Sequence, residues 1–134
     1  MDVVVIDSPP GVVTATRSLL AVTDLIIVPF RLSLLDILST EVIIALAAQA
    51  IKGNRSLKLW LLMAKKDPGS MIGRETRGIF AGCGLNVYKP EIGSRIAFVE
   101  ATVSGLTALE YTPGSRTYAE VAELTDEILK EIGL

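Results

Sequence analysis

The sequence predicts an α/β fold with a mostly parallel, doubly wound sheet and helices on both faces. Apolar runs rich in β-branched residues predict strands buried on both faces, because apolar and polar side chains do not alternate along them. Segments with helical spacing of apolar residues separate these runs, an order typical of parallel sheets. The 134 residues contain no internal repeat and no linker, so we expect a single domain over residues 1–134.

The first expected strand covers Asp2–Asp7, where residues 3–6 form an unbroken β-branched run. The segment Ser8-Pro9-Pro10-Gly11 must end this strand, because proline cannot donate to a sheet ladder and restricts the residue before it. Asp7 would then lie at the carboxyl end of a buried strand, where open α/β sheets bind ligands. Two functions stay open for it: holding a magnesium-bound water, or capping the next turn.

The remaining elements are expected to alternate in type along the chain. They are a helix at Val13–Ala21, a strand at Leu25–Val28, a helix at Ser33–Lys52, a strand at Leu57–Ala64, a helix at Gly73–Ala81, a short strand at Asn86–Tyr88, a loop at Lys89–Gly93, a short helix at Arg95–Val103 and a last helix from Ser115 or Thr117. Thr117 and Glu120 have the spacing of a capping box.

Composition excludes several classes of function. The chain has no histidine, which argues against a Ser/His/Asp hydrolase and against a zinc site. A net charge of -2 means that any contact with DNA must come from a local basic patch. The single cysteine and the absence of a leader-like start favour a cytoplasmic location. The apolar stretch Leu32–Ile51 contains Asp36 and Glu41, which would be costly in lipid, so no membrane span is expected.

Several blocks of the sequence resemble one family. A strand ending in Asp7-Ser8-Pro9-Pro10-Gly11 resembles the Walker B and switch II segment of the ParA/MinD family of chromosome- and plasmid-partitioning P-loop ATPases. The likeness continues through Arg17–Pro29, the helix start at Ser33–Asp36, Arg74–Arg77 and Ile92–Arg116. No Gly-x-x-x-x-Gly-Lys-Ser/Thr loop occurs, so the chain resembles the C-terminal portion of such a nucleotide-binding domain without its Walker A loop, an incomplete P-loop NTPase fold.

The resemblance implies ATP and Mg²⁺ as cofactors, nonspecific DNA binding and a ParB-like partner protein. In this chain Asp7 would hold magnesium through water, while Pro9, Pro10 and Gly11 would sense the terminal phosphate. The residues implied to border the base are Pro90, Ile92 and Gly93. The candidate DNA contacts are Lys65, Arg74, Arg77 and Arg95, although scattered basic residues are also typical of an ordinary solvated surface.

Three interpretations therefore stay open. The first is a partitioning ATPase that does not hydrolyse ATP as this chain alone, because the phosphate cradle supplies most of the positioning and charge that phosphoryl transfer needs. The second is a nonenzymatic subunit that binds DNA or a partner, and the third is a truncated piece without separate function. We also expect self-association, by strand exchange, because loss of the neighbouring strand would expose unpaired backbone and apolar surface.

Overall fold

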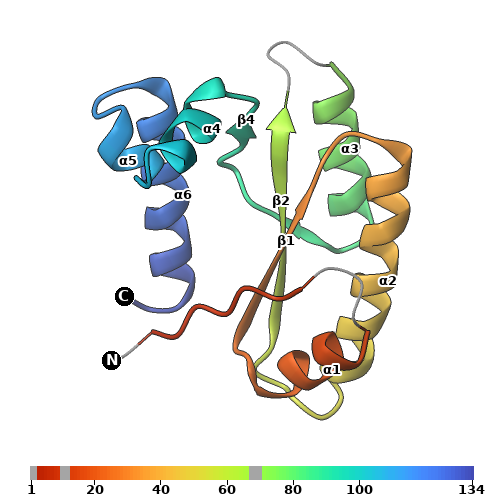
Figure 1. Ribbon diagram of the computed structural model, residues 1–134. Coiled ribbons are helices and arrows are strands. Elements are labelled where there is room, and N and C mark those ends of the chain that lie inside the picture. Colours follow the sequence, from red (N-terminus) through yellow and green to blue (C-terminus); the bar gives the residue numbers. More distant parts are fainter. Residues whose placement is uncertain (1–2, 10–12, 67–70) are drawn as a thin grey trace.

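The computed structural model describes residues 3–9, 13–66 and 71–134, and it has the expected α/β architecture of a parallel sheet flanked by helices (Figure 1). The elements in chain order are α1 (Val13–Val22), β1 (Leu25–Phe30), α2 (Leu34–Ala50), β2 (Lys58–Lys66), α3 (Met71–Gly82), β3 (Asn86–Val87), β4 (Ile92–Gly93), α4 (Ile96–Val103), α5 (Ala108–Tyr111) and α6 (Arg116–Glu131).

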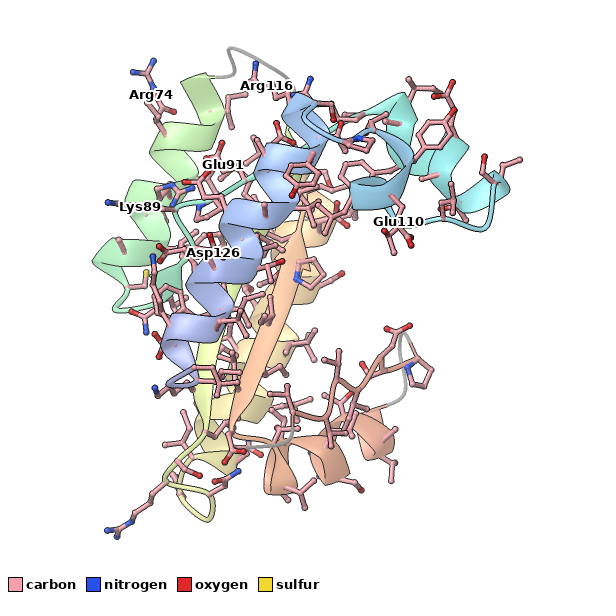
Figure 2. All side chains as sticks on the ribbon, turned by 90° about the vertical axis from the view of Figure 1, so that its left-hand side faces the viewer. Arg74, Lys89, Glu91, Glu110, Arg116 and Asp126 are labelled. Atoms are coloured by element: carbon pink, nitrogen blue, oxygen red, sulfur yellow. The ribbon has the colours of Figure 1, made fainter. Side chains whose placement is uncertain are left out.

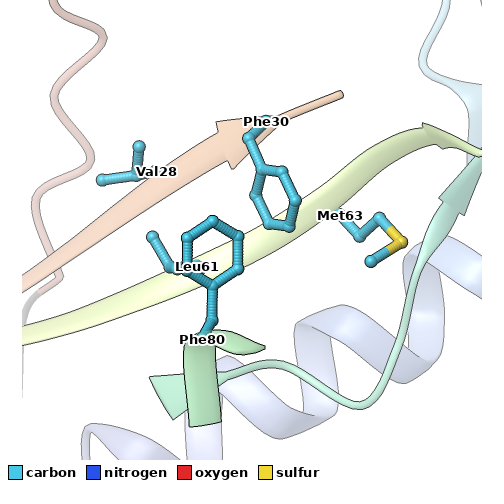
Figure 3. Packing of buried hydrophobic residues seen from close by; sticks show 5 residues of the cluster. All are labelled: Val28, Phe30, Leu61, Met63 and Phe80. Atoms are coloured by element: carbon cyan, nitrogen blue, oxygen red, sulfur yellow. The ribbon is translucent and has the colours of Figure 1, made fainter. Parts of the chain in front are cut away.

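β2 is the centre of the sheet. It pairs in parallel with β1 from Leu25↔Lys58 to Phe30↔Met63, and in parallel with β3 at Trp60 and Leu61. Farther along, β2 pairs with β4 in the register Ala64↔Ile92. Residues 86–93 therefore run alongside β2, on the edge opposite β1. This path brings β4 to the carboxyl end of β2 (Figure 3).

One face of the sheet carries the main apolar core. It is formed by buried side chains from β1, β2 and α3 (Figure 3), namely Val28, Phe30, Leu61, Met63 and Phe80. The rings of Phe30 and Phe80 meet edge to face with centroids 5.2 Å apart. Ile37, Ile43 and Ile44 of α2 pack against this cluster, so α2 and α3 cover the same face. The connections β1–α2–β2 and β2–α3–β3 each join two parallel strands. Because such crossovers share the same handedness, both helices lie on the same face of the sheet.

The opposite face is covered by α6, which lies on the other side of the sheet from α2 and α3 (Figure 1). Lys58, Trp60 and Leu62 alternate with the core residues of β2, so they point to this side. Trp60 stacks on Tyr88 with centroids 4.4 Å apart. The Nζ atom of Lys58 lies 2.8 Å from the carboxylate of Glu131 at the end of α6. Helices thus flank both faces, as the sequence predicts.

The expected first strand is wrong for the described residues 3–7. Residues 3–9 have no regular secondary structure, and the exposed fractions of Val4 and Val5 are 81% and 90%. The segment passes β1 at an angle in both whole-molecule views (Figures 1 and 2). A strand buried on both faces needs a paired neighbour and covering layers, and an apolar β-branched run supplies neither by itself.

Two local expectations near the C-terminus also need correction. The box expected at Thr117 and Glu120 is wrong: Ser115 caps α6 by accepting a hydrogen bond from the Tyr118 amide at 3.1 Å. A capping box does form one helix earlier, between Thr107 and Glu110 of α5. The segment expected as a plain loop contains the strand β4, whose two residues were too few for a pattern to detect.

The long helix α2 is apolar on all sides, so that Leu35, Leu38 and Val42 remain exposed. Ser33 caps its first turn. Among the helices of the described residues, none is long and apolar enough to cross a membrane.

Candidate functional site at the carboxyl edge of the sheet

A hollow of ≈ 230 Å³ lies where β1 and β2 end. Its lining consists of Pro29, Phe30, Arg31, Asp36 and Ala64. The lining residues from the two strands are apolar, whereas the charged pair consists of Arg31, just after β1, and Asp36, in the first turn of α2. Parallel sheets present such an edge to their ligands, because the loops that follow the strands gather there.

The ion pair at this hollow is held by the cap of α2. Nε of Arg31 lies 2.7 Å from Oδ2 of Asp36, and the Ser33 hydroxyl donates to the same oxygen at 2.9 Å. Ser33 Oγ in turn accepts from the Asp36 amide at 3.2 Å. The hydrogen bond and charge of Asp36 raise the pKa of the Arg31 guanidinium above its ordinary value. The Asp36 carboxylate therefore already accepts hydrogen bonds from both Arg31 and Ser33.

The segment expected to border a base lies beside this hollow. Ile92 pairs with Ala64, which is part of the lining. Pro90 is buried, while Ile92 and Gly93 are half-buried. Residues 90–93 and the hollow thus share one edge of the sheet, and contact with a base stays a prediction.

Glu120 joins β4 to α6 through three donors. Its carboxylate accepts from the Gly93 amide at 3.0 Å and from Arg95 at 2.7 Å, and Nε of Arg116 lies 3.3 Å away. Burial alone would raise the pKa of Glu120, but these hydrogen bonds and positive charges outweigh it and hold the pKa below its ordinary value. A side chain at Gly93 would crowd the Arg95 guanidinium, with a Cβ only 3.1 Å from it. A larger residue at position 93 would therefore require the Arg95 side chain to shift by a few tenths of an ångström.

Two of the candidate DNA contacts take part in intramolecular ion pairs. Arg77 in α3 donates to the backbone carbonyls of Tyr88 and Lys89 and pairs with Glu91 at 2.8 Å. Arg95 pairs with Glu120, and its side chain is 23% exposed. Each arginine fixes the path of residues 88–95, and a contact with DNA would compete with these bonds.

Arg74 differs from Arg77 and Arg95. It is exposed near the start of α3, and it forms no ion pair within the described part of the chain. Figure 2 shows it at the same end of the molecule as Arg116, whose side chain is 74% exposed. The side chain of Lys65 lies outside what the structure describes. Sequence reasoning placed Arg116 only in a block that resembles the family and did not single out Arg31; the position of Arg116 next to the cap Ser115, and of Arg31 two residues before the cap Ser33, was the available signal.

The magnesium-side residues are not brought to this edge. Asp7 and Pro9 are exposed in the irregular segment 3–9, which Figures 1 and 2 place well below the carboxyl end of β2. Pro10 and Gly11 lie outside the described residues. Within residues 3–9, 13–66 and 71–134, no cluster of three or more His, Cys, Asp or Glu side chains is arranged to hold a metal ion. The functions of Asp7 and Pro9 stay predictions.

Comparison with known proteins gives a distant match. No protein-family model matches the chain. The chain is 27% identical over 130 residues to the maintenance of carboxysome distribution protein A of Halothiobacillus neapolitanus. The aligned region covers 96% of this chain and 60% of that relative, so the chain spans less than two thirds of the relative's length.

Proposed function

We propose that this chain is part of the nucleotide-binding domain of a positioning ATPase of the ParA/MinD type. The observation that carries the proposal is the similarity, over 96% of the chain, to a protein named for distributing carboxysomes. Partitioning and distribution both require a protein that moves or spaces a cargo. The sequence blocks from Asp7 to Arg116 that resemble the partitioning family support the same assignment.

The carboxyl edge is the side that would receive the nucleotide. The hollow beside Ala64 and β4 offers an apolar floor suited to a purine ring, with Arg31 and Asp36 as polar neighbours. Nothing in the chain resembles the glycine-rich loop and lysine that cradle phosphates. We therefore assign base contact to this edge and leave the phosphates without a described partner.

A binding experiment tests this assignment. Saturation-transfer NMR with adenosine and with ATP should give similar, weak binding, because the phosphates gain no contact. Ala64→Leu should abolish the signal by filling the hollow. Ala119→Leu, an exposed change on α6, is the matched control and should leave it intact. Absence of binding by both ligands, or binding that Ala64→Leu leaves unchanged, would refute the assignment.

Hydrolysis is expected to be absent from this chain by itself. Phosphoryl transfer depends on positioning and electrostatic stabilisation of the transferred group, and the loop that provides most of both is not in the sequence. A phosphate-release assay with Mg-ATP should match the buffer blank. Magnesium-dependent release that disappears in Asp7→Ala would overturn this expectation.

A second candidate function is nonenzymatic binding to DNA, and the exposed Arg74 favours it. Arginine contacts to phosphate weaken as salt rises, because binding releases counterions. Fluorescence anisotropy with duplex DNA should show salt-sensitive binding that Arg74→Glu weakens. Arg55→Glu, at an exposed arginine in the α2–β2 loop near the opposite edge of the sheet, is the control. Equal effects of both variants would indicate only a change of net charge and would reject an Arg74 site.

A further inference from the structure

We propose that Arg77 of α3 and Glu120 of α6 are positioning residues for a base at the carboxyl edge of the sheet. Neither side chain lines the hollow. Together they hold residues 88–95, the segment that passes beside the hollow, from helices on opposite faces of the sheet (Figure 1). The inference rests on the proposed contact of a base with this edge, and it adds the residues that set the geometry of that contact.

The backbone pairing of this segment is short and irregular. β4 consists of two residues, and it joins β2 through the pairs Ala64↔Ile92 and Lys66↔Gly93. The register shifts between these two pairs. Pro90, two residues before Ile92, lacks an N–H and cannot donate to a neighbouring strand. The position of the segment thus depends on polar side chains from elsewhere in the chain.

Arg77 holds the first half of the segment from the α3 side. Its guanidinium donates to the carbonyl oxygen of Tyr88 and, at 3.3 Å, to that of Lys89. The same group lies 2.8 Å from the carboxylate of Glu91. The side chains of Arg77 and Glu91 are only 27% and 24% exposed, so salt screens this pair less than a fully exposed one. One planar, rigid donor group therefore fixes three acceptors within residues 88–91.

Glu120 holds the second half of the segment from the α6 side. Its Oε2 atom accepts from the Gly93 amide at 3.0 Å, and its Oε1 atom accepts from Arg95 at 2.7 Å. An ionised acceptor makes both hydrogen bonds stronger than those between neutral groups. Residues 93 and 95 are therefore tied to one carboxylate, whose side chain is 15% exposed.

The residues between these contacts are the ones that would border a base. Pro90 is buried and Ile92 is half-buried, and neither has a polar side chain of its own. Ile92 pairs with Ala64, which lines the hollow. A ligand binds more weakly where it must first order a loose segment. Loss of Arg77 or Glu120 should therefore lower the affinity for a base without removing any contact to it.

The affinity for adenosine, measured by NMR titration, tests both positions. Arg77→Leu and Glu120→Leu should each raise the dissociation constant about fivefold, because binding must then order the released segment. The matched controls are Arg74→Leu on α3 and Glu123→Leu on α6. Both of these side chains are exposed and form no ion pair within the described residues, so both controls should bind as the unmodified chain does.

Two further measurements separate positioning from a general loss of stability. Glu120→Gln keeps an oxygen that can accept from the Gly93 amide, so it should bind adenosine more tightly than Glu120→Leu. Hydrogen exchange at the Gly93 amide should become faster in Glu120→Leu, while the amides of β1 and β2 in the core stay protected. If the core amides also lose protection, Arg77→Leu and Glu120→Gln carry the comparison with the controls.

The possible negative results are distinguishable. If the unmodified chain does not bind adenosine, the proposed base contact fails and this inference fails with it. A second result would overturn this inference alone. In that case the unmodified chain binds and Ala64→Leu abolishes binding, but Arg77→Leu and Glu120→Leu bind as tightly as their controls.

Discussion

Two short apolar runs of this chain have similar composition and opposite environments. Residues 3–6 and residues 25–28 are both uncharged, rich in β-branched side chains and followed by a proline within a few positions. Val28 is 4% exposed in the sheet, whereas Val5 is 90% exposed in a segment without regular structure. The second run has β2 beside it and α2 and α3 over it, and the first has neither. Strand propensity therefore selects which residues can form a strand, and tertiary neighbours decide whether they do.

The largest expected effect comes from placing the same charge in each run. Val28→Asp puts a carboxylate into the core beside Phe30 and Leu61, without a partner to neutralise it. We expect it to cost about 4 kcal/mol or more, a large share of the roughly 5–15 kcal/mol that stabilises a domain. Val5→Asp should change the free energy of unfolding by less than about 0.5 kcal/mol. Urea denaturation at concentrations low enough to avoid association measures both, and similar losses would contradict the contrast in burial.

Burial also decides how much a polar contact contributes, as the ion pair between Arg95 and Glu120 of α6 shows. Arg95→Ala would leave Glu120, whose side chain is 15% exposed, without its closest cation. We expect a loss of about 1–3 kcal/mol at neutral pH. Because the folded-state pKa of Glu120 is lowered, its contribution to stability is complete above the unfolded pKa of about 4.3 and is lost as the pH falls through the folded value.

The acid limb of the stability profile tests that sign. The unmodified chain should lose stability as the pH drops below about 4.3, and Glu120→Gln should make that limb shallower. Glu123→Gln is the control, because Glu123 is exposed on α6 and forms no ion pair within the described residues. It should leave the slope unchanged within error. An unchanged slope in Glu120→Gln would show that the ion pair contributes nothing to folding.

A smaller effect is expected at the helix caps, where sequence patterns and structure can be compared directly. Ser115→Ala removes the oxygen that accepts the Tyr118 amide and should cost about 1 kcal/mol. Thermal unfolding measures the loss, and an unchanged melting temperature in Ser115→Ala would mean that the cap of Ser115 does not stabilise α6.

The sequence predicts the parts of this fold that depend on local patterns. Unbroken apolar runs identify β1 and β2, and the spacing around Ser33 identifies the start of α2. What it misses depends on contacts between distant residues. The carboxylate of Glu120 bonds the Gly93 amide 27 residues away, instead of capping its own helix. A pattern of neighbouring residues cannot predict this contact, because the two groups are far apart in the sequence.

The same limit applies to the candidate site. The family resemblance implies that Pro90–Gly93 borders a base, which stays a prediction; the structure brings β4 of that segment to the end of β2. It also predicts Asp7 at a strand end, on the assumption that residues 2–7 lie in the sheet. That assumption requires a neighbour for the strand, and within the described residues none is present. Arg77 and Arg95 look like free surface cations in the sequence, because their partners Glu91 and Glu120 are 14 and 25 residues away.

The smallest expected effect concerns a buried polar atom on the α6 face of the sheet. The ring of Tyr88 stacks on Trp60, but its hydroxyl has no hydrogen-bond partner within the described chain. Burial, with the nearby charges of Glu131 and Glu127, raises the pKa of Tyr88 to about 12. The neutral form is thus favoured in the folded state, so stability is complete below the unfolded pKa of about 10 and declines as the pH rises from there toward 12.

Tyr88→Phe separates the ring from the hydroxyl. It keeps the stack and removes an unsatisfied polar group, so at neutral pH we expect no loss and a gain of up to about 1 kcal/mol. The alkaline decline in stability should shrink in the same variant. Tyr118→Phe, at a side chain that is 39% exposed, should leave that decline as it is in the unmodified chain. A loss of more than about 1 kcal/mol in Tyr88→Phe would mean that the hydroxyl is satisfied in solution. Water would then reach the α6 face of the sheet, unlike the core formed by Val28 and Leu61. The comparison of buried and exposed apolar runs would have to include a third environment, in which side chains are buried from bulk solvent but still contact water.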